Sequence, residues 1–190
     1  DWSDIGGRFS ASFLKPALWG SRNDLLIDGY VYREVTEGYT ARAVGGTAAI
    51  RHRFTDRFSI QGGIEAERGQ ASDVLGRIDY TLIGLPVGLT YDSTDSLLDL
   101  TEGFRVTASL APYPSFFGSD PGIFIARGQA STYYALDEER AYVLAGRIGL
   151  GSITGAALDE IPANRRFYAG GGGSVRGYVY QSLGPGGPFD

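Results

Sequence analysis

Alternation of apolar or small residues with polar residues, at a period of two, constrains this chain more than any other feature. Between residues 123 and 136, the even positions from Phe124 to Leu136 are apolar, small or Thr, whereas Arg127, Gln129 and Ser131 occupy odd positions. This pattern is typical of a β-strand with one apolar face and one polar face. Helical spacing is sustained nowhere, so the sequence predicts an all-β fold.

The same alternation predicts eight strands. We expect them at residues 5–15, 23–36, 39–54, 57–70, 77–91, 103–113, 122–136 and 141–154. Most exceed the usual globular strand of about five or six residues and reach the roughly 9–11 residues that a tilted strand needs to cross a bilayer. The turn-like connections between them favour an antiparallel up-and-down meander.

The two faces of these strands favour a membrane barrel over a soluble β-sandwich, which is the alternative binding module. The apolar face is rich in Gly and Ala, whereas the inner face of a sandwich carries bulky residues. Mid-strand charges on the other face suit a wet lumen, and they are Arg42, Glu65, Arg105, Arg127 and Arg147. Aromatic residues near strand ends resemble interfacial girdles, and they are Trp19, Tyr39, Tyr91, Tyr113, Tyr133, Tyr134 and Tyr142.

Composition excludes several other classes. The 190 residues include no cysteine, no methionine and a single histidine, His52, which excludes a disulfide scaffold, thiol catalysis and a multi-histidine metal centre. A net charge of −5 without a basic run argues against nucleic-acid binding. No apolar run is long enough for a transmembrane helix. The missing initiator methionine indicates a processed chain or a piece of a longer one.

Two pairs of carboxylates could carry chemistry. Glu65 and Glu67 lie at i and i+2 on one strand face, close enough for a glycosidase arrangement, but nothing else in the sequence supports catalysis. Asp92 and Asp95 could bind a cation, yet as turn-capping residues they need none. The sequence therefore predicts no catalytic residue, no metal ion and no cofactor.

The pattern changes after residue 154, where a Gly-rich segment contains several arginines. Its sequence contains RFYAGG at 166–171, SVRGY at 174–178 and QSLGP at 181–185. Together these stretches resemble the sixth extracellular loop of the BamA/TamA superfamily, and they are most similar to the TamA branch. The residues that carry this resemblance are Arg166, Phe167, Ala169, Gly170, Gly171, Ser174, Val175, Arg176, Gly177, Tyr178, Gln181 and Pro185.

A second stretch, residues 89–104, resembles the strand–turn–strand motif YDxTDxxLxPTxGF of the same superfamily. The matching residues are Tyr91, Asp92, Thr94, Asp95, Gly103 and Phe104. The chain departs from the motif at Leu100, where Pro is usual, and at Glu102, where a basic residue is common. Leu100 makes the turn less rigid than Pro would, but the motif still predicts that the two flanking strands pair.

The resemblance implies an antiparallel transmembrane β-barrel of which this chain supplies roughly eight of about sixteen strands. Residues 1–154 would form strands of a partial barrel, and residues 155–190 an extracellular loop that folds into the lumen. Within that loop, Arg176 would dock on acidic groups of the inner wall, with Val175, Gly177 and Tyr178 shaping the tip. Glu65 or Glu67 could serve as its partner.

The resemblance also implies a function in the bacterial outer membrane. Such a barrel assists the insertion or translocation of other outer-membrane proteins, including autotransporter-type clients, without chemical catalysis. Its partners would be the lipid bilayer, client outer-membrane proteins and a periplasm-spanning protein, with POTRA domains preceding residue 1 and no nucleic acid. The alternatives are a stand-alone eight-stranded barrel, acting as an adhesin, pore or enzyme, and a two-partner secretion transporter of the same superfamily.

Overall fold

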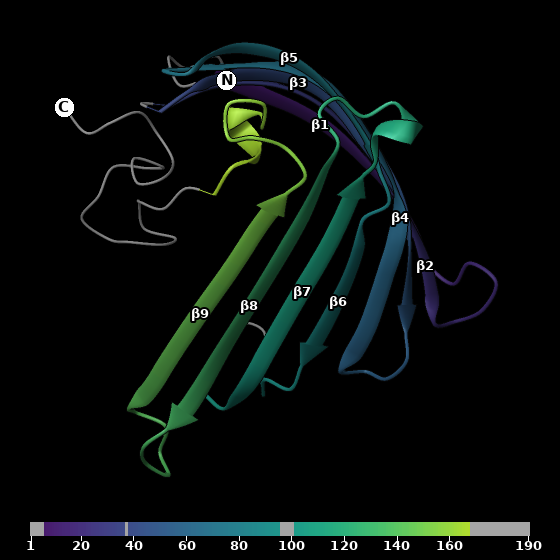
Figure 1. Cartoon of the computed structure of the whole chain (residues 1–190). Coiled ribbons are helices and arrows are strands. Elements are labelled where there is room, and N and C mark those ends of the chain that lie inside the picture. Colours follow the sequence, from purple (N-terminus) through teal and green to yellow (C-terminus); the bar gives the residue numbers. More distant parts are fainter. Residues whose placement is uncertain (1–5, 37, 96–100, 168–190) are drawn as a thin grey trace.

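One antiparallel β-sheet contains almost all the regular structure of the chain (Figure 1). The computed structural model describes residues 6–36, 38–95 and 101–167. The strands are β1 Gly6–Lys15, β2 Asn23–Val35, β3 Thr40–Arg53, β4 Phe58–Asp73, β5 Gly76–Gly84, β6 Val87–Asp92, β7 Gly103–Tyr113, β8 Ile123–Ala135 and β9 Val143–Thr154. Two short 3-10 turns follow β7 and β9, namely η1 Ser115–Phe117 and η2 Ala163–Arg165. Across these ranges, no helix is long and apolar enough to cross a membrane.

The strand expected at residues 77–91 is divided into β5 and β6 by Leu85 and Pro86. Because Pro86 has no backbone N–H, it cannot continue the ladder as a donor. The first part of β4, from Phe58, pairs with β6, and the later part, up to Asp73, pairs with β5. The alternation pattern missed this break because apolar residues continue through it.

The sheet is open in the described part of the chain. Its order is β1-β2-β3-β4-β6-β7-β8-β9, with β5 attached to β4, so that β1 and β9 form the two ends. The all-β, antiparallel up-and-down fold expected from the sequence is confirmed. A stand-alone closed barrel would need β1 to pair with β9, and no such pairing occurs among the described strands.

The sheet is strongly curled, with one concave and one convex face (Figure 1). The two faces carry different side chains. The concave face carries a buried cluster around Tyr80, Leu82 and Tyr113, which also includes residues of the segment after β9. The convex face exposes large apolar side chains on most strands, among them Phe9, Phe13, Val31, Val44, Ile64, Leu110, Ile148 and Leu150. An apolar outer face and a polar inner face are what a barrel wall in a bilayer requires.

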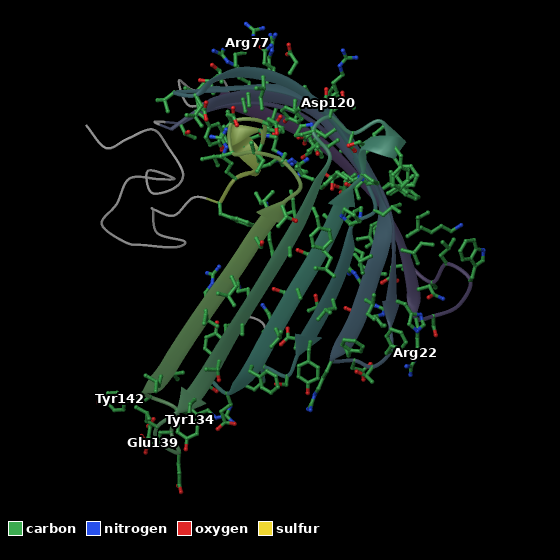
Figure 2. All side chains as sticks on the ribbon, viewed as in Figure 1. Arg22, Arg77, Asp120, Tyr134, Glu139 and Tyr142 are labelled. Atoms are coloured by element: carbon green, nitrogen blue, oxygen red, sulfur yellow. The ribbon has the colours of Figure 1, made fainter. Side chains whose placement is uncertain are left out.

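Three residues lie on a different face or at a different depth than the sequence predicts. Arg42 is on the convex face, because the concave positions of β3 are the odd ones, including the buried Ala41 and Ala43. Tyr39 and Tyr113 are buried on the concave side rather than placed in a girdle. By contrast, Trp19, Tyr134 and Tyr142 are well exposed, and Figure 2 shows the last two at the lower end of the sheet.

Candidate loop-docking site on the concave face

The segment after β9 returns to the concave face instead of extending away from it. Its 3-10 turn η2 lies against β3 and β4, beneath the arch that β1 to β5 form (Figure 1). Ile161, Pro162 and Ala163 are buried there. Burial of these apolar side chains against the sheet fixes the position of the three polar residues that follow them, Asn164, Arg165 and Arg166.

Arg165 is held between two carboxylates of β4. Its Nη2 lies 2.8 Å from Oε1 of Glu65 and 2.9 Å from Oε2 of Glu67, and its Nε donates to Oε1 of Glu67 at 3.2 Å. Glu65 and Glu67 reach the same cation because residues two apart in a strand share a face. The Glu67 side chain is only 2% exposed.

Three tyrosines from neighbouring strands complete the hydrogen bonding of these carboxylates. Tyr30 of β2 and Tyr80 of β5 donate to Glu67 at 2.5 and 2.8 Å, and Tyr113 of β7 donates to Glu65 at 3.0 Å. A buried ion pair is tolerated when further hydrogen bonds satisfy its lone pairs, which these hydroxyls do. One arginine of the docked segment is therefore connected to four strands.

The docked arginine stays charged. Burial by itself would lower the pKa of Arg165, but the nearby negative charges of Glu67 and Glu65 outweigh that effect and raise the pKa above its ordinary value. The ion pair is consequently insensitive to pH on the alkaline side.

Asn164 and Arg166 add contacts on either side of Arg165. The Asn164 amide nitrogen donates to the hydroxyls of Tyr32 at 2.6 Å and Tyr80 at 2.8 Å. Arg166, 6% exposed, forms an ion pair with Asp73 at the end of β4 and donates twice to the Ile161 carbonyl oxygen, at 3.1 and 2.9 Å. These contacts anchor the segment at its upper end.

Phe167 packs on a glycine of β9. A Cβ atom added to Gly151 would lie 2.5 Å from the Phe167 ring, so the ring occupies the space that a side chain would need. The guanidinium of Arg127 lies 5.1 Å from the centre of the same ring, within the range of a cation–π contact. The first part of the loop motif, Arg166 and Phe167, is thus docked on the inner wall.

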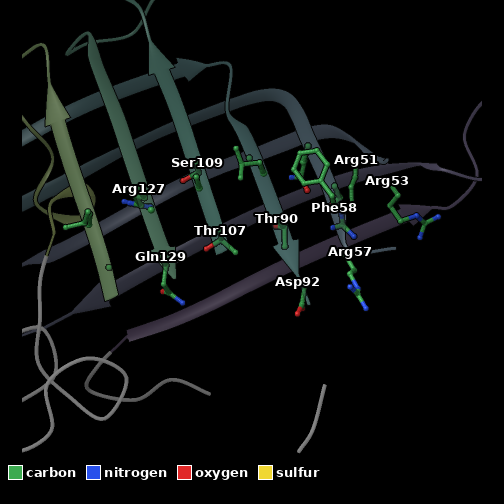
Figure 3. Close-up of a pocket in the computed structure, with 18 of the residues that line it drawn as sticks. Arg51, Arg53, Arg57, Phe58, Thr90, Asp92, Thr107, Ser109, Arg127 and Gln129 are labelled. Atoms are coloured by element: carbon green, nitrogen blue, oxygen red, sulfur yellow. The ribbon is translucent and has the colours of Figure 1, made fainter. Parts of the chain in front are cut away.

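Below the docked segment, the concave face has an open hollow of about 1300 Å³ (Figure 3). Its basic lining residues are Arg51, Arg53, Arg57, Arg127 and Arg147, and its acidic ones are Asp56 and Asp92. Thr90, Thr107, Ser109 and Gln129 supply uncharged polar groups. The polar strand face predicted for Arg105, Arg127 and Arg147 is confirmed, and Arg105 forms an ion pair with Asp92 at 2.6 Å.

The strand–turn–strand motif is built around its two aspartates. Asp92 accepts hydrogen bonds from the backbone and hydroxyl of Thr94, at 3.1 and 2.6 Å. Asp95 accepts from the hydroxyl and backbone N–H of Thr101, at 2.5 and 3.1 Å, and from the Glu102 N–H at 3.1 Å. Arg140, in the turn between β8 and β9, lies 3.0 Å from Asp95. Because Thr101 and Glu102 donate to the charged form, the pKa of Asp95 lies well below its usual range.

The flanking motif residues close the turn. Gly103 has a φ of 103°, and a Cβ atom there would lie 2.5 Å from the Ser93 carbonyl oxygen, so only glycine fits. Tyr91 and Phe104 stack with their ring centres 5.1 Å apart. The motif residues therefore lie together, and they serve the geometry of the turn.

Ten residues of the loop motif lie outside the described residues, and nothing is observed of their structure. They are Ala169, Gly170, Gly171, Ser174, Val175, Arg176, Gly177, Tyr178, Gln181 and Pro185. Docking of Arg176 therefore stays a prediction. The carboxylates suggested as its partners, Glu65 and Glu67, are occupied by Arg165, which the sequence did not single out. Its position next to Arg166 in the motif was the signal that could have found it.

A curled sheet with an apolar convex face, a polar concave face and an inward-folded loop is the wall of a transmembrane β-barrel. The family model described as Omp85 superfamily domain matches residues 3–188, and the chain belongs to this superfamily. The expected resemblance to the BamA/TamA superfamily is thereby confirmed, whereas the TamA-like branch stays a prediction.

The fold is similar to a solved structure of the same kind. It matches the crystal structure of BamA from Haemophilus ducreyi lacking POTRA domains 1–3, with a TM-score of 0.83 and 18% sequence identity. The match covers 95% of this chain and 39% of that chain. This chain therefore spans well under half the length of the matched protein. The activity and partners of a whole assembly barrel can only be proposed for it.

Proposed function

We propose that this chain forms part of a bacterial outer-membrane barrel that assists the insertion or translocation of other outer-membrane proteins. Membership of the Omp85 superfamily and the barrel-wall fold support this role and this location. The work involves no bond-making chemistry and no cofactor. Within this role we propose a TamA-like function, with autotransporter-type clients and a periplasm-spanning partner protein.

The observation that carries the proposal is the docked segment on the concave face. A polar loop that folds inward must replace the water it loses with protein partners, and Arg165 does so through Glu65 and Glu67. Because the same carboxylates accept hydrogen bonds from β2, β5 and β7, docking ties one side of the wall together. This part of the wall would stay fixed while a client strand pairs with an open edge elsewhere through backbone hydrogen bonds.

We assign residues 1–154 to strands of the barrel wall and residues 155–190 to the extracellular loop. In this arrangement the turns at 55–57, 92–102 and 137–140 face the periplasm. Arg176 would dock deeper in the lumen, with Val175, Gly177 and Tyr178 shaping the tip. Its acidic partners would be groups other than Glu65 and Glu67, because those are already bonded to Arg165.

The test compares arginine substitutions in the full-length protein. We expect Arg165→Gln and Arg176→Ala to lower the yield of folded client proteins in the outer membrane more than Arg105→Ala does, at equal levels of the barrel itself. Equal yields for all three variants would contradict the special role of the loop. Intact assembly together with lost export of one dedicated substrate would favour the two-partner secretion transporter instead.

A further inference from the structure

Four arginines lie close together on the convex face, at the end of the sheet where η2 lies on the other side. Arg33 of β2 is directly opposite Arg42 of β3 in the strand register. Arg68 of β4 is opposite Val44, one convex row below Arg42, and Arg77 of β5 is opposite Ser72, one convex row above. All four side chains are exposed. Figure 2 shows Arg77 at the top of the arch, on its outer side.

These arginines have no ion-pair partner in the part of the chain that the structure describes. Asp79 lies in the convex row that contains Arg33 and Arg42, and its carboxylate accepts a hydrogen bond from Gln70 at 2.5 Å. The adjacent acidic residues Glu34, Glu67 and Asp73 point to the concave face and have partners there. Like charges directly opposite in a sheet are destabilising, so the pairing of Arg33 with Arg42 costs stability unless an anion binds beside it.

The depth of the cluster says what kind of anion fits. β2, β3 and β4 contain 13, 14 and 16 residues, more than the roughly 9–11 that cross the hydrocarbon, so these strands extend beyond it. Because the cluster lies towards their upper ends, we expect it at the level of the lipid headgroups. The convex row that contains Arg68 also contains Phe9, Val31 and Val44, and these residues are 72%, 50% and 58% exposed. Cations and an apolar surface thus adjoin each other.

We propose that Arg33, Arg42, Arg68 and Arg77 bind the phosphate groups of a phosphorylated glycolipid in the outer leaflet. The guanidinium fork matches phosphate oxygens with two parallel hydrogen bonds. The acyl chains of the lipid would lie on Phe9, Val31 and Val44, which a free anion would leave uncovered. The choice of the outer leaflet rests on the membrane orientation in the proposed function, whereas recognition of a phosphorylated lipid does not.

The test measures lipid binding by the purified, delipidated full-length protein in neutral detergent. The probes are bisphosphorylated lipid A, the same lipid without its phosphates, and inorganic phosphate alone. The test variant is Arg33→Gln/Arg42→Gln. The matched control is Arg51→Gln/Arg57→Gln, which removes two cations that line the hollow on the other face. Heat-dependent gel mobility verifies the fold of each variant, and Arg68→Gln/Arg77→Gln replaces the test pair if it does not fold.

We expect the test variant to bind the phosphorylated lipid about tenfold more weakly than the parent, because charge-assisted hydrogen bonds are lost, and the control variant to bind like the parent. Removing the phosphates from the lipid should weaken its binding to the parent protein by the same factor of about ten. Equal binding by parent and test variant, or an equal loss in the control, would overturn the site. Displacement of the lipid by inorganic phosphate would overturn the lipid as its ligand. No client protein is present, so this outcome and that of the assembly test are independent.

Discussion

The guanidinium of Arg165 lies 2.9 Å from the carboxylate of Glu67, although 98 residues separate them in the chain. This contact joins the segment after the last strand to the middle of the sheet. Tyr30 and Tyr80 also donate to Glu67, so the carboxylate has lost its water but none of its hydrogen bonds. The inward fold of the loop depends on this arrangement.

Glu67→Gln should destabilise the protein more than Glu65→Gln. Removing one member of a buried ion pair is destabilising, and Arg165 then keeps only the Glu65 carboxylate, so we expect a loss of up to about 3 kcal/mol in the free energy of unfolding. Glu65 is the matched control because its side chain is 13% exposed, against 2% for Glu67, and because Arg165 keeps two contacts with Glu67 when Glu65 is changed. Urea unfolding in lipid vesicles, followed by tryptophan fluorescence, measures both. Equal losses would contradict the central place of Glu67.

Gly103→Ala should weaken the turn between β6 and β7. The positive φ and the Ser93 carbonyl oxygen leave no room for a methyl group, so we expect a cost of about 1–3 kcal/mol. Gly128→Ala is the control, because a Cβ atom there meets nothing within 4 Å. Its effect should stay within about 0.5 kcal/mol. Urea midpoints of the two variants decide, and a neutral Gly103→Ala would show that the turn adjusts freely.

The stabilising effect of Asp95 should depend on pH. Its pKa is lowered in the folded protein, so its contribution is complete above the ordinary carboxyl pKa of about 3.9 and is lost as the pH falls toward the folded value. We therefore expect Asp95→Asn to be less stable than the parent at pH 7, with the difference narrowing below about pH 4. Asp56→Asn is the control in a neighbouring exposed turn. A difference that is constant from pH 7 to pH 3 would refute the assignment.

The sequence predicted the strands well because period-two alternation is a local property of the chain. It failed where the two faces are chemically alike. In residues 41–49, small residues occupy both faces of β3, so nothing in the pattern indicated that Arg42 lies outside. The break at Pro86 was missed because apolar residues flank it on both sides.

The candidate site was predictable only in part. The lumen position of Glu65 and the turn role of Asp92 and Asp95 follow from spacing along one strand or turn. The carboxylate partners of Arg165 come from β4, and the tyrosines that donate to those carboxylates come from β2, β5 and β7. No local pattern predicts which residues meet across a curled sheet. Tyr113 was expected in an aromatic girdle because it lies near a strand end, but nearness to a strand end does not tell on which face of the sheet a side chain lies.

Thiol accessibility tests the docked loop most directly, because the chain contributes no other cysteine. Ala163→Cys places a thiol at a residue that is 2% exposed, and Ala157→Cys places one at an exposed position of the same segment. In the folded full-length protein, we expect a membrane-impermeant maleimide to label position 157 rapidly and position 163 slowly. Adding Glu67→Gln should accelerate labelling at position 163 alone. If the thiol at position 163 reacts as fast as the one at 157 without that substitution, the segment is not docked on the concave face.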